Sequence, residues 1–238
     1  MAGEATPRPG WLLDELGSAG RENLDAAHVA RYDGKEDAGA AAEVALLEEL
    51  GLTADSTVVE LGPGTGQFTV AVAPRCRRVV AADVSAPMLE RLRGKLADRG
   101  IANVEVVQAG FLGYEHSGPA ADFAYSRYAL HHLPDFWKAM ALARLREILR
   151  EGGVLRLWDV VFDFEPAAAA ARIEAWCASG GESGEGEWSR AELEEHVRDE
   201  HSTFTWLLEP MVERSGFEIE AAERSADGIF SKYVLRAR

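Results

Sequence analysis

The chain has 238 residues, which is enough for one α/β domain with a full hydrophobic core. Its 40 Asp and Glu against 25 Lys and Arg give a formal net charge of −15, a field that repels phosphate backbones and argues against a nucleic-acid partner. No run of about 18 apolar residues, no signal segment and no cysteine pairing motif is present, which argues against a membrane span, secretion and a disulfide or thiolate-zinc framework. We therefore expect a cytoplasmic protein without membrane contact.

From about residue 38 onward, helical periods alternate with short β-rich runs, which is typical of βαβ units around a mostly parallel sheet. The pattern predicts helices over residues 40–50, 66–73, 85–100 and 135–149. It predicts strands over residues 56–61, 78–83, 104–108, 123–126 and 154–161. Two further β-rich runs, 217–224 and 229–235, are separated by a turn-forming cluster and predict a C-terminal hairpin.

We interpret residues 1–238 as a single domain with two additions to the sheet and its helices. Residues 1–36 form an N-terminal extension or lid with several apolar side chains that could dock on the domain. These are Trp11, Leu12, Leu13 and Tyr32. Residues 163–204 form a helical insertion that could cover a binding site.

The insertion is expected to hold an Ala-rich helix near 166–177, an acidic Gly-rich loop over 180–187 and a second helix. Ser189 with Glu192 three residues later fits a capping box for that second helix. Trp188 is either part of a mobile lid or ordinary core. For Trp206, among other apolar residues, core packing is the better interpretation.

The most informative stretch is Glu60-Leu61-Gly62-Pro63-Gly64-Thr65-Gly66-Gln67, in which an apolar strand runs into glycines at every second position. Glycine tolerates positive φ and has no Cβ, so a flat adenosine-type ligand can lie against such a turn. A purely structural glycine turn is the alternative. The next strand ends in Asp83, about 20 residues beyond the first glycine, where a carboxylate can accept both ribose hydroxyls.

A nicotinamide site would have G-x-G-x-x-G, whose third glycine is replaced here by Gln67. An acidic residue, then G-x-G-x-G, then an acid at the tip of the second strand resembles class I S-adenosylmethionine-dependent methyltransferases. Residues 124–134 resemble the small-molecule branch of that superfamily that includes quinone-biosynthesis-like enzymes. The resemblance runs from about Tyr32 to the C-terminal hairpin.

The resemblance implies a Rossmann-like three-layer sandwich, with a seven-stranded, mostly parallel sheet and an antiparallel C-terminal hairpin strand. It implies S-adenosylmethionine as the cofactor and S-adenosylhomocysteine as the product. Glu60 would lie near the donor's amino end, the glycines would line the donor, Asp83 would bind the ribose, and Val84 and Met88 would flank the adenine. The implied cofactor-binding set is Tyr32, Glu60, Gly62, Gly64, Gly66, Asp83, Val84, Met88, Gly110, Phe111 and Arg127.

One position departs from the family pattern. After the third strand the family usually has an acidic residue that holds the adenine amino group, whereas this chain has Gly110 followed by Phe111. Gly110 has no side chain to supply, so backbone groups would hold the adenine and Phe111 would form an apolar wall.

Methyl transfer from a sulfonium is an in-line displacement that needs alignment, desolvation and sometimes a base. His131 or His132 is the candidate base, with Arg127 and Tyr128 orienting the acceptor; the alternative is that each histidine packs and caps the following helix. Neighbouring histidines rarely converge on one ion and no carboxylate cluster accompanies them in the sequence, so no metal is expected.

The leading function is methyl transfer to a small-molecule acceptor by a monomer or homodimer. The alternative is a protein that binds S-adenosylmethionine for regulation or scaffolding without turnover. A nicotinamide oxidoreductase is disfavoured by Gln67.

Overall fold

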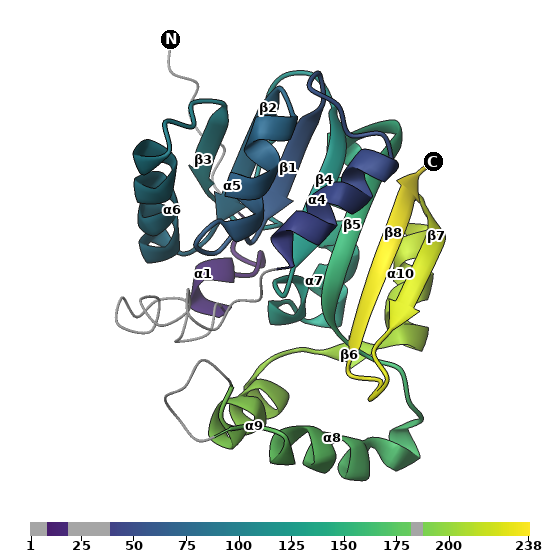
Figure 1. The fold of residues 1–238 in the computed structure, drawn as a ribbon. Helices are drawn as coiled ribbons and strands as arrows, with labels where there is room; N and C mark the ends of the chain where they lie inside the picture. Colours follow the sequence, from purple (N-terminus) through teal and green to yellow (C-terminus); the bar gives the residue numbers. More distant parts are fainter. Residues whose placement is uncertain (1–8, 19–38, 182–187) are drawn as a thin grey trace.

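A twisted central sheet organises the molecule (Figure 1). The computed structural model describes residues 9–18, 39–181 and 188–238. The strands are β1 (Thr57–Leu61), β2 (Arg78–Asp83), β3 (Val104–Gln108), β4 (Ala121–Arg127), β5 (Leu149–Phe162), β6 (Thr203–Phe204), β7 (Phe217–Arg224) and β8 (Phe230–Ala237). They follow the order β3-β2-β1-β4-β5-β8-β7, with β6 pairing β5 off this path. The pairs from β3 to β5 are parallel, and β8 is antiparallel to both β5 and β7.

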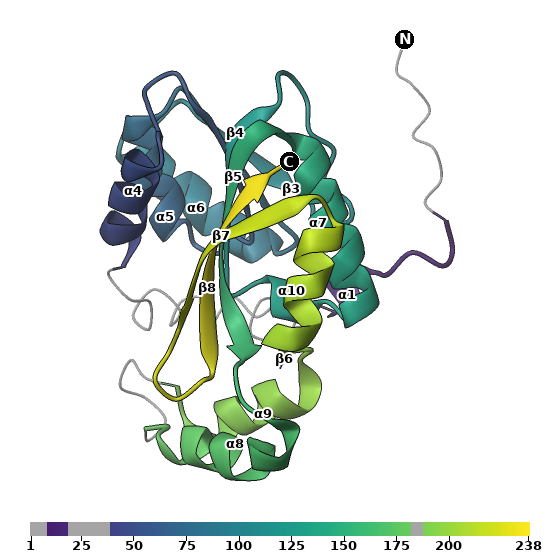
Figure 2. The same ribbon diagram turned by 90° about the vertical axis from the view of Figure 1, so that its right-hand side faces the viewer.

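Helices cover both faces of the sheet, which confirms the predicted Rossmann-like three-layer sandwich (Figure 2). The helices are α1 (Glu15–Ser18), α4 (Ala40–Glu49), α5 (Gln67–Val72), α6 (Ala86–Asp98), α7 (Asp135–Ile148), α8 (Ala169–Ala178), α9 (Arg190–Asp199) and α10 (Thr205–Arg214). Val58 packs with α4 and α5, whereas its neighbour Val59 packs with α7 and α10. This follows from the two-residue period of a strand, which sends successive side chains to opposite faces.

The chain order of the strands reverses between β1 and β4. From β1 the chain proceeds outward through β2 and β3, and then crosses back to form β4 and β5 on the other side of β1. In open parallel sheets a crevice forms at such a switch point, outside the carboxyl ends of the strands. The fold therefore places a binding site where β1, β2 and β4 end.

Two elements near the C-terminus were not predicted. β6 has two residues that pair in parallel with the end of β5, Thr203 with Val161 and Phe204 with Phe162. α10 contains Pro210, which weakens a helical pattern. The interpretation of Trp206 as core is wrong: it is 55% exposed on α10 and stacks on Phe204, whereas Leu208 and Val212 of the same helix are buried.

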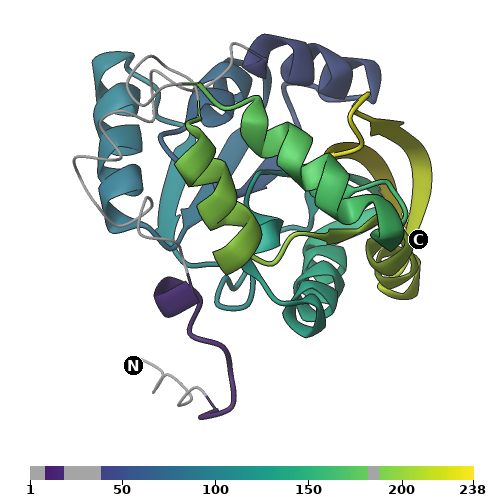
Figure 3. The ribbon, with the colours of Figure 1, turned by 90° about the horizontal axis from the view of Figure 1, so that it is seen from below.

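Helices α8 and α9 lie beyond the carboxyl edge of the sheet, between the end of β5 and the start of β6 (Figures 1 and 3). The predicted capping box is present: Ser189 Oγ accepts from the Glu192 N–H, and the Glu192 carboxylate accepts from the Ser189 N–H. The two helices form a roof over the switch point.

The N-terminal segment that the structure describes, residues 9–18, docks on the domain. Leu12 and Leu13 pack against the main hydrophobic core, and Trp11 stacks on Trp137 of α7 at 6.2 Å between ring centroids. Of the four predicted docking groups, Leu12 and Leu13 contact the core, Trp11 is 68% exposed, and Tyr32 lies outside the described residues.

A buried ion pair crosses from β5 to α4. Arg156 donates from Nε and Nη2 to the two carboxylate oxygens of Glu43 at 2.7 and 2.9 Å, and both side chains are almost fully buried. The pair explains how a charged residue is accommodated in the apolar run of β5.

None of the helices in the described ranges has both the length and the apolar character to span a lipid bilayer.

Candidate active site

A cavity of about 620 Å³ lies at the switch point and extends beneath the roof formed by α8 and α9. Among the predicted site residues, its lining includes Glu60, Gly62, Gly64, Asp83, Val84, Met88, Gly110, Phe111, Arg127, His131 and His132. Gly66 lies next to the lining as the N-cap of α5, and Tyr32 lies outside the described residues. The volume is typical of a pocket for a small organic ligand.

The glycine turn after β1 requires glycine for two different reasons. Gly62, Gly64 and Gly66 all have positive φ, at 76°, 54° and 84°. A Cβ on Gly62 would meet the Ala129 side chain at 2.4 Å, and a Cβ on Gly66 would meet Leu92 at 2.2 Å. The turn therefore has left-handed backbone and leaves no room for side chains at Gly62 and Gly66. Without side chains, its backbone can approach a ligand in the cavity.

Asp83 at the end of β2 holds the glycine turn in place. Its Oδ2 accepts from the Gly64 N–H at 3.0 Å and its Oδ1 accepts from the Ser85 N–H at 2.8 Å. Burial raises the pKa of Asp83, although these backbone hydrogen bonds oppose the shift. The carboxylate lines the cavity and retains lone pairs for further donors.

Glu60 and Tyr125 lie at the β1 and β4 side of the cavity. Glu60 is buried and accepts a short hydrogen bond from Thr69 Oγ1. Tyr125 stacks on Phe68 at 3.7 Å between ring centroids. Its Oη atom is buried and has no hydrogen-bond partner among the described residues. The sequence did not single out Tyr125, because a tyrosine in a buried strand is usually core.

An acidic side chain does stand beside Gly110, and it comes from the N-terminal segment. The Glu15 carboxylate accepts from the Leu112 N–H through both oxygens at 3.0 Å, although the two residues are 97 positions apart. A Cβ on Gly110 would lie 2.3 Å from Glu15 Oε1 and 2.8 Å from Val84 Cγ1. Glu15, only 9% exposed, therefore occupies the space that a side chain at position 110 would need.

The exit of β4 carries an aromatic and cationic cluster. The Arg127 guanidinium lies 4.0 Å from the Trp158 ring centroid and 5.0 Å from that of Tyr128. Tyr128 has a φ of 51°, which is rare for a residue with a Cβ and concentrates at functional sites. Both Arg127 and Tyr128 line the cavity, in keeping with the predicted orienting role, which stays a prediction.

His131 is held by a buried carboxylate. Its Nδ1 lies 2.5 Å from Asp159 Oδ1, and Asp159 also accepts from the backbone N–H groups of Leu130 and Val160 at 2.8 and 2.7 Å. Burial alone would lower the pKa of His131, but Asp159 and Glu200 raise it to about 10. Burial and the positive charge of His131 lower the pKa of the neighbouring His132 to about 3.

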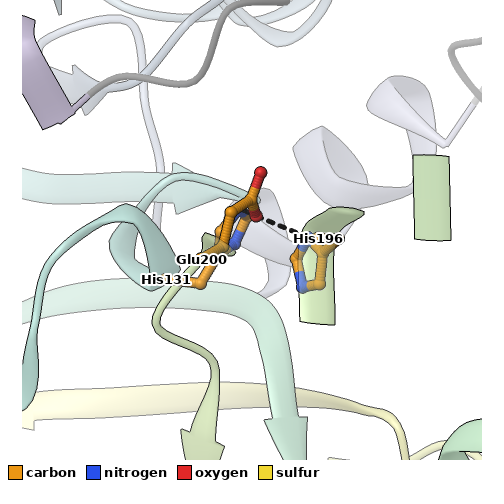
Figure 4. A group of neighbouring side chains, drawn as sticks. All are labelled: His131, His196 and Glu200. Carbon is orange, nitrogen blue, oxygen red and sulfur yellow. Dashed lines mark ion pairs between the residues drawn. The ribbon is translucent and has the colours of Figure 1, made fainter. Parts of the chain in front are cut away.

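A second carboxylate reaches His131 from the roof (Figure 4). Glu200 Oε2, at the C-terminal end of α9, lies 2.9 Å from His131 Nε2 and 2.5 Å from His196 Nδ1. His196 Nε2 in turn contacts Ser202 Oγ at 2.8 Å. The sequence shows no carboxylate cluster next to the histidines, and the fold brings Asp159 and Glu200 to them from distant positions.

Part of the chain is similar to known methyltransferases. Residues 58–153 match the model of a methyltransferase domain. A protein of Geobacillus thermodenitrificans described as an uncharacterized methyltransferase is 28% identical over 173 residues, which cover 73% of this chain and 74% of that protein. A ribosomal RNA small subunit methyltransferase A of Koribacter versatilis is 38% identical over 72 residues, covering 30% of this chain and 25% of that enzyme.

Among solved structures, an S-adenosylmethionine-dependent methyltransferase from Clostridium acetobutylicum superposes with a TM-score of 0.65. It is 13% identical and the match covers 89% of this chain and 97% of that chain, so it shows a shared fold. Together, these findings show that part of the chain is similar in sequence to methyltransferases and that its fold is shared with an S-adenosylmethionine-dependent one.

Proposed function

We propose that this protein transfers the methyl group of S-adenosylmethionine to a small-molecule acceptor held between the carboxyl edge of the sheet and the roof of α8 and α9. The observation that carries the proposal is that one cavity joins the glycine turn and Asp83 to a chamber lined by aromatic side chains. The glycine turn and Asp83 suit an adenosyl donor, and the aromatic chamber suits a small-molecule acceptor.

On the donor side, each role follows from what the residue offers. The glycine turn lets backbone approach the donor, Asp83 accepts the ribose hydroxyls, and Glu60 receives the donor's amino group. Val84 and Met88 flank the adenine, with Phe111 as a wall. The unpartnered Tyr125 Oη next to Glu60 would hydrogen-bond the polar end of the donor.

Glu15 supplies the acid that position 110 lacks. In the proposed arrangement, its carboxylate receives the adenine amino group while it keeps the hydrogen bond from Leu112, because an ionised carboxylate has about four lone-pair sites. The Gly110 to Phe111 backbone would complete the adenine contact. The missing side chain is thus replaced across the fold by the N-terminal segment.

On the acceptor side, the chamber combines aromatic rings with charged and polar side chains. Tyr128, Trp176, Trp188 and Phe230 line it, and Trp176 meets Phe230 edge-on at 5.9 Å. Rings of this kind favour a flat or apolar acceptor body. The net charge of −15 disfavours a polyanionic acceptor, and the similarity to the ribosomal RNA enzyme covers only 30% of this chain. Likeness of residues 124–134 to the quinone-biosynthesis-like branch points the same way.

Of the two candidate bases, geometry favours His132, although its pKa, lowered to about 3, makes it a weak base. Both ring nitrogens of His131 face carboxylates, Asp159 on one side and Glu200 on the other, so that imidazole is fully engaged. His132 lines the cavity beside it with its side chain 20% exposed. In the displacement, the acceptor's lone pair forms the new bond to the methyl carbon while the bond to sulfur breaks, and His132 takes the acceptor's proton. The neutral thioether leaves with the adenosyl group.

The decisive experiment uses a donor carrying a labelled methyl group. The full-length protein is incubated with it and with a cell extract divided into small-molecule, RNA and protein fractions. Label in the small-molecule fraction, absent with His132→Ala, is the expected result. Label confined to RNA would overturn the acceptor class, and donor binding without label in any fraction would instead support the alternative of a binding protein without turnover. Failure to bind S-adenosylhomocysteine would overturn the proposal altogether.

A further inference from the structure

We infer that His131, His196 and Glu200 bind a divalent first-row transition-metal ion at the roof side of the cavity. One ligand atom from each residue lies within 4.8 Å of the other two (Figure 4). All three residues line the cavity, so the proposed ion would face the acceptor chamber. The inference rests on the side-chain geometry and makes no use of the methyl donor.

The contacts between these residues do not have the geometry of hydrogen bonds. Glu200 Oε2 is buried and lies 2.9 Å from His131 Nε2 and 2.5 Å from His196 Nδ1, yet it accepts no hydrogen bond from any described residue. A carboxylate oxygen at this distance from two ring nitrogens needs a cation or protons between them. An ion bound between these three atoms would explain why they lie close together without forming hydrogen bonds to one another.

Each histidine has its other ring nitrogen fixed by a second group. Asp159 holds Nδ1 of His131 and is itself anchored by backbone N–H groups, so Nε2 is left to face Glu200. Ser202 Oγ holds Nε2 of His196, which leaves Nδ1 to face Glu200. Metal-bound histidines almost always have such a partner on the second nitrogen, because it fixes the tautomer and the direction of the lone pair.

The charges balance for a dication. Asp159 and Glu200 bring two carboxylates into a mostly buried place beside the imidazoles of His131 and His196. Two neutral imidazoles with one divalent ion neutralise this pair of carboxylates. Two imidazolium protons would do the same, and this is the competing description that the experiment must separate.

Two imidazoles and one carboxylate favour Zn²⁺, Fe²⁺ or Co²⁺ over Ca²⁺ and Mg²⁺, which prefer oxygen ligands. Three protein ligands leave at least one coordination position for a solvent or acceptor oxygen. If the proposed function holds, that position selects acceptors with a hydroxyl or carboxylate oxygen. The expectation of no metal considered only the adjacent histidines, whereas this site combines one of them with two residues spaced four apart at the end of α9.

The test uses the untagged full-length protein after removal of metals with a chelator. Titration with Co²⁺ is followed by visible absorption, and Zn²⁺ affinity is measured by competition with a coloured chelator. We expect one ion per chain, with affinity lowered at least tenfold by His196→Ala and by the shape-conserving Glu200→Gln. His116→Ala, remote from the site, should bind as the wild type does.

No saturable Co²⁺ absorption, or equal affinity in Glu200→Gln and the wild type, would show that protons alone neutralise the site. Asp159→Asn offers a second measure, because loss of the carboxylate behind His131 should weaken the ion without removing a ligand. Circular dichroism of each variant identifies any that fails to fold. Since the donor is absent throughout, this result is independent of the donor-binding experiment above.

Discussion

A Cβ atom at position 110 would lie 2.3 Å from Glu15 Oε1, so Glu15 can enter the site only because residue 110 has no side chain. In the proposed function, Glu15 takes the place of the acidic side chain that position 110 lacks. The relationship can be tested as an exchange.

Glu15→Gln should weaken binding of S-adenosylhomocysteine by about 10- to 100-fold, because a hydrogen bond to a charged group contributes roughly 1.5–3 kcal/mol. Calorimetric titration measures the affinity, with the exposed Glu49→Gln as the matched control. Gly110→Asp alone should clash with Glu15, whereas the same change in a Glu15→Ala background should recover affinity. Equal affinity in Glu15→Gln and the wild type would remove Glu15 from the donor site.

Asp83→Asn should weaken donor binding by at least about tenfold, because the amide presents N–H donors where the ribose hydroxyls and the Gly64 N–H need acceptors. The exposed Asp98→Asn at the end of α6 is the control. Burial raises the pKa of Asp83, so protonation as the pH falls should reduce affinity at a higher pH than for an ordinary aspartate. A donor affinity that is flat across the acidic range would contradict this role.

Tyr125→Phe should separate stability from binding. The Oη atom is buried without a partner among the described residues, so its removal should leave the free energy of unfolding unchanged or raise it, by up to about 1–3 kcal/mol. Donor affinity should fall if this hydroxyl meets the donor. Denaturant unfolding and calorimetry give the two quantities, and a destabilised variant with normal affinity would refute the assignment.

Most strands and helices of the sheet could be predicted from local sequence patterns. β2 begins and ends where its apolar run does, since buried parallel strands read as continuous hydrophobic segments, and Ser85 caps α6 as predicted. β6 escaped prediction because its two residues are held by β5 rather than by their own propensity. Local patterns say nothing about such long-range pairing.

The residues of the candidate site also fall into two groups, those within a local sequence motif and those that only the fold brings together. The glycine turn and Asp83 were predicted because a motif within about 25 residues carries them. Glu15, His196 and Glu200 reach the cavity from elements at either end of the chain, and only the fold brings them to β3 and to the end of β4. The four-residue spacing of His196 and Glu200 on one helix face was the signal available in the sequence.

Breaking the buried pair of Arg156 and Glu43 should cost about 3–5 kcal/mol of unfolding free energy when one partner is removed, because the other charge is then left unpaired. Glu43→Gln tests this by thermal or denaturant unfolding. The double change Glu43→Leu with Arg156→Met should recover most of the loss. A single variant as stable as the wild type would show that water reaches the guanidinium.

The pairing of β6 with the end of β5 fixes both ends of the α8 and α9 segment side by side. Both ends of this segment are therefore anchored at one place on the sheet. Insertions in this segment need not disturb the strands, because lengthening a loop whose ends are fixed adds little entropic cost. Under the proposed function, changes in the segment between β5 and β6 would alter the acceptor side of the cavity. The glycine turn and Asp83 on the donor side would be unaffected.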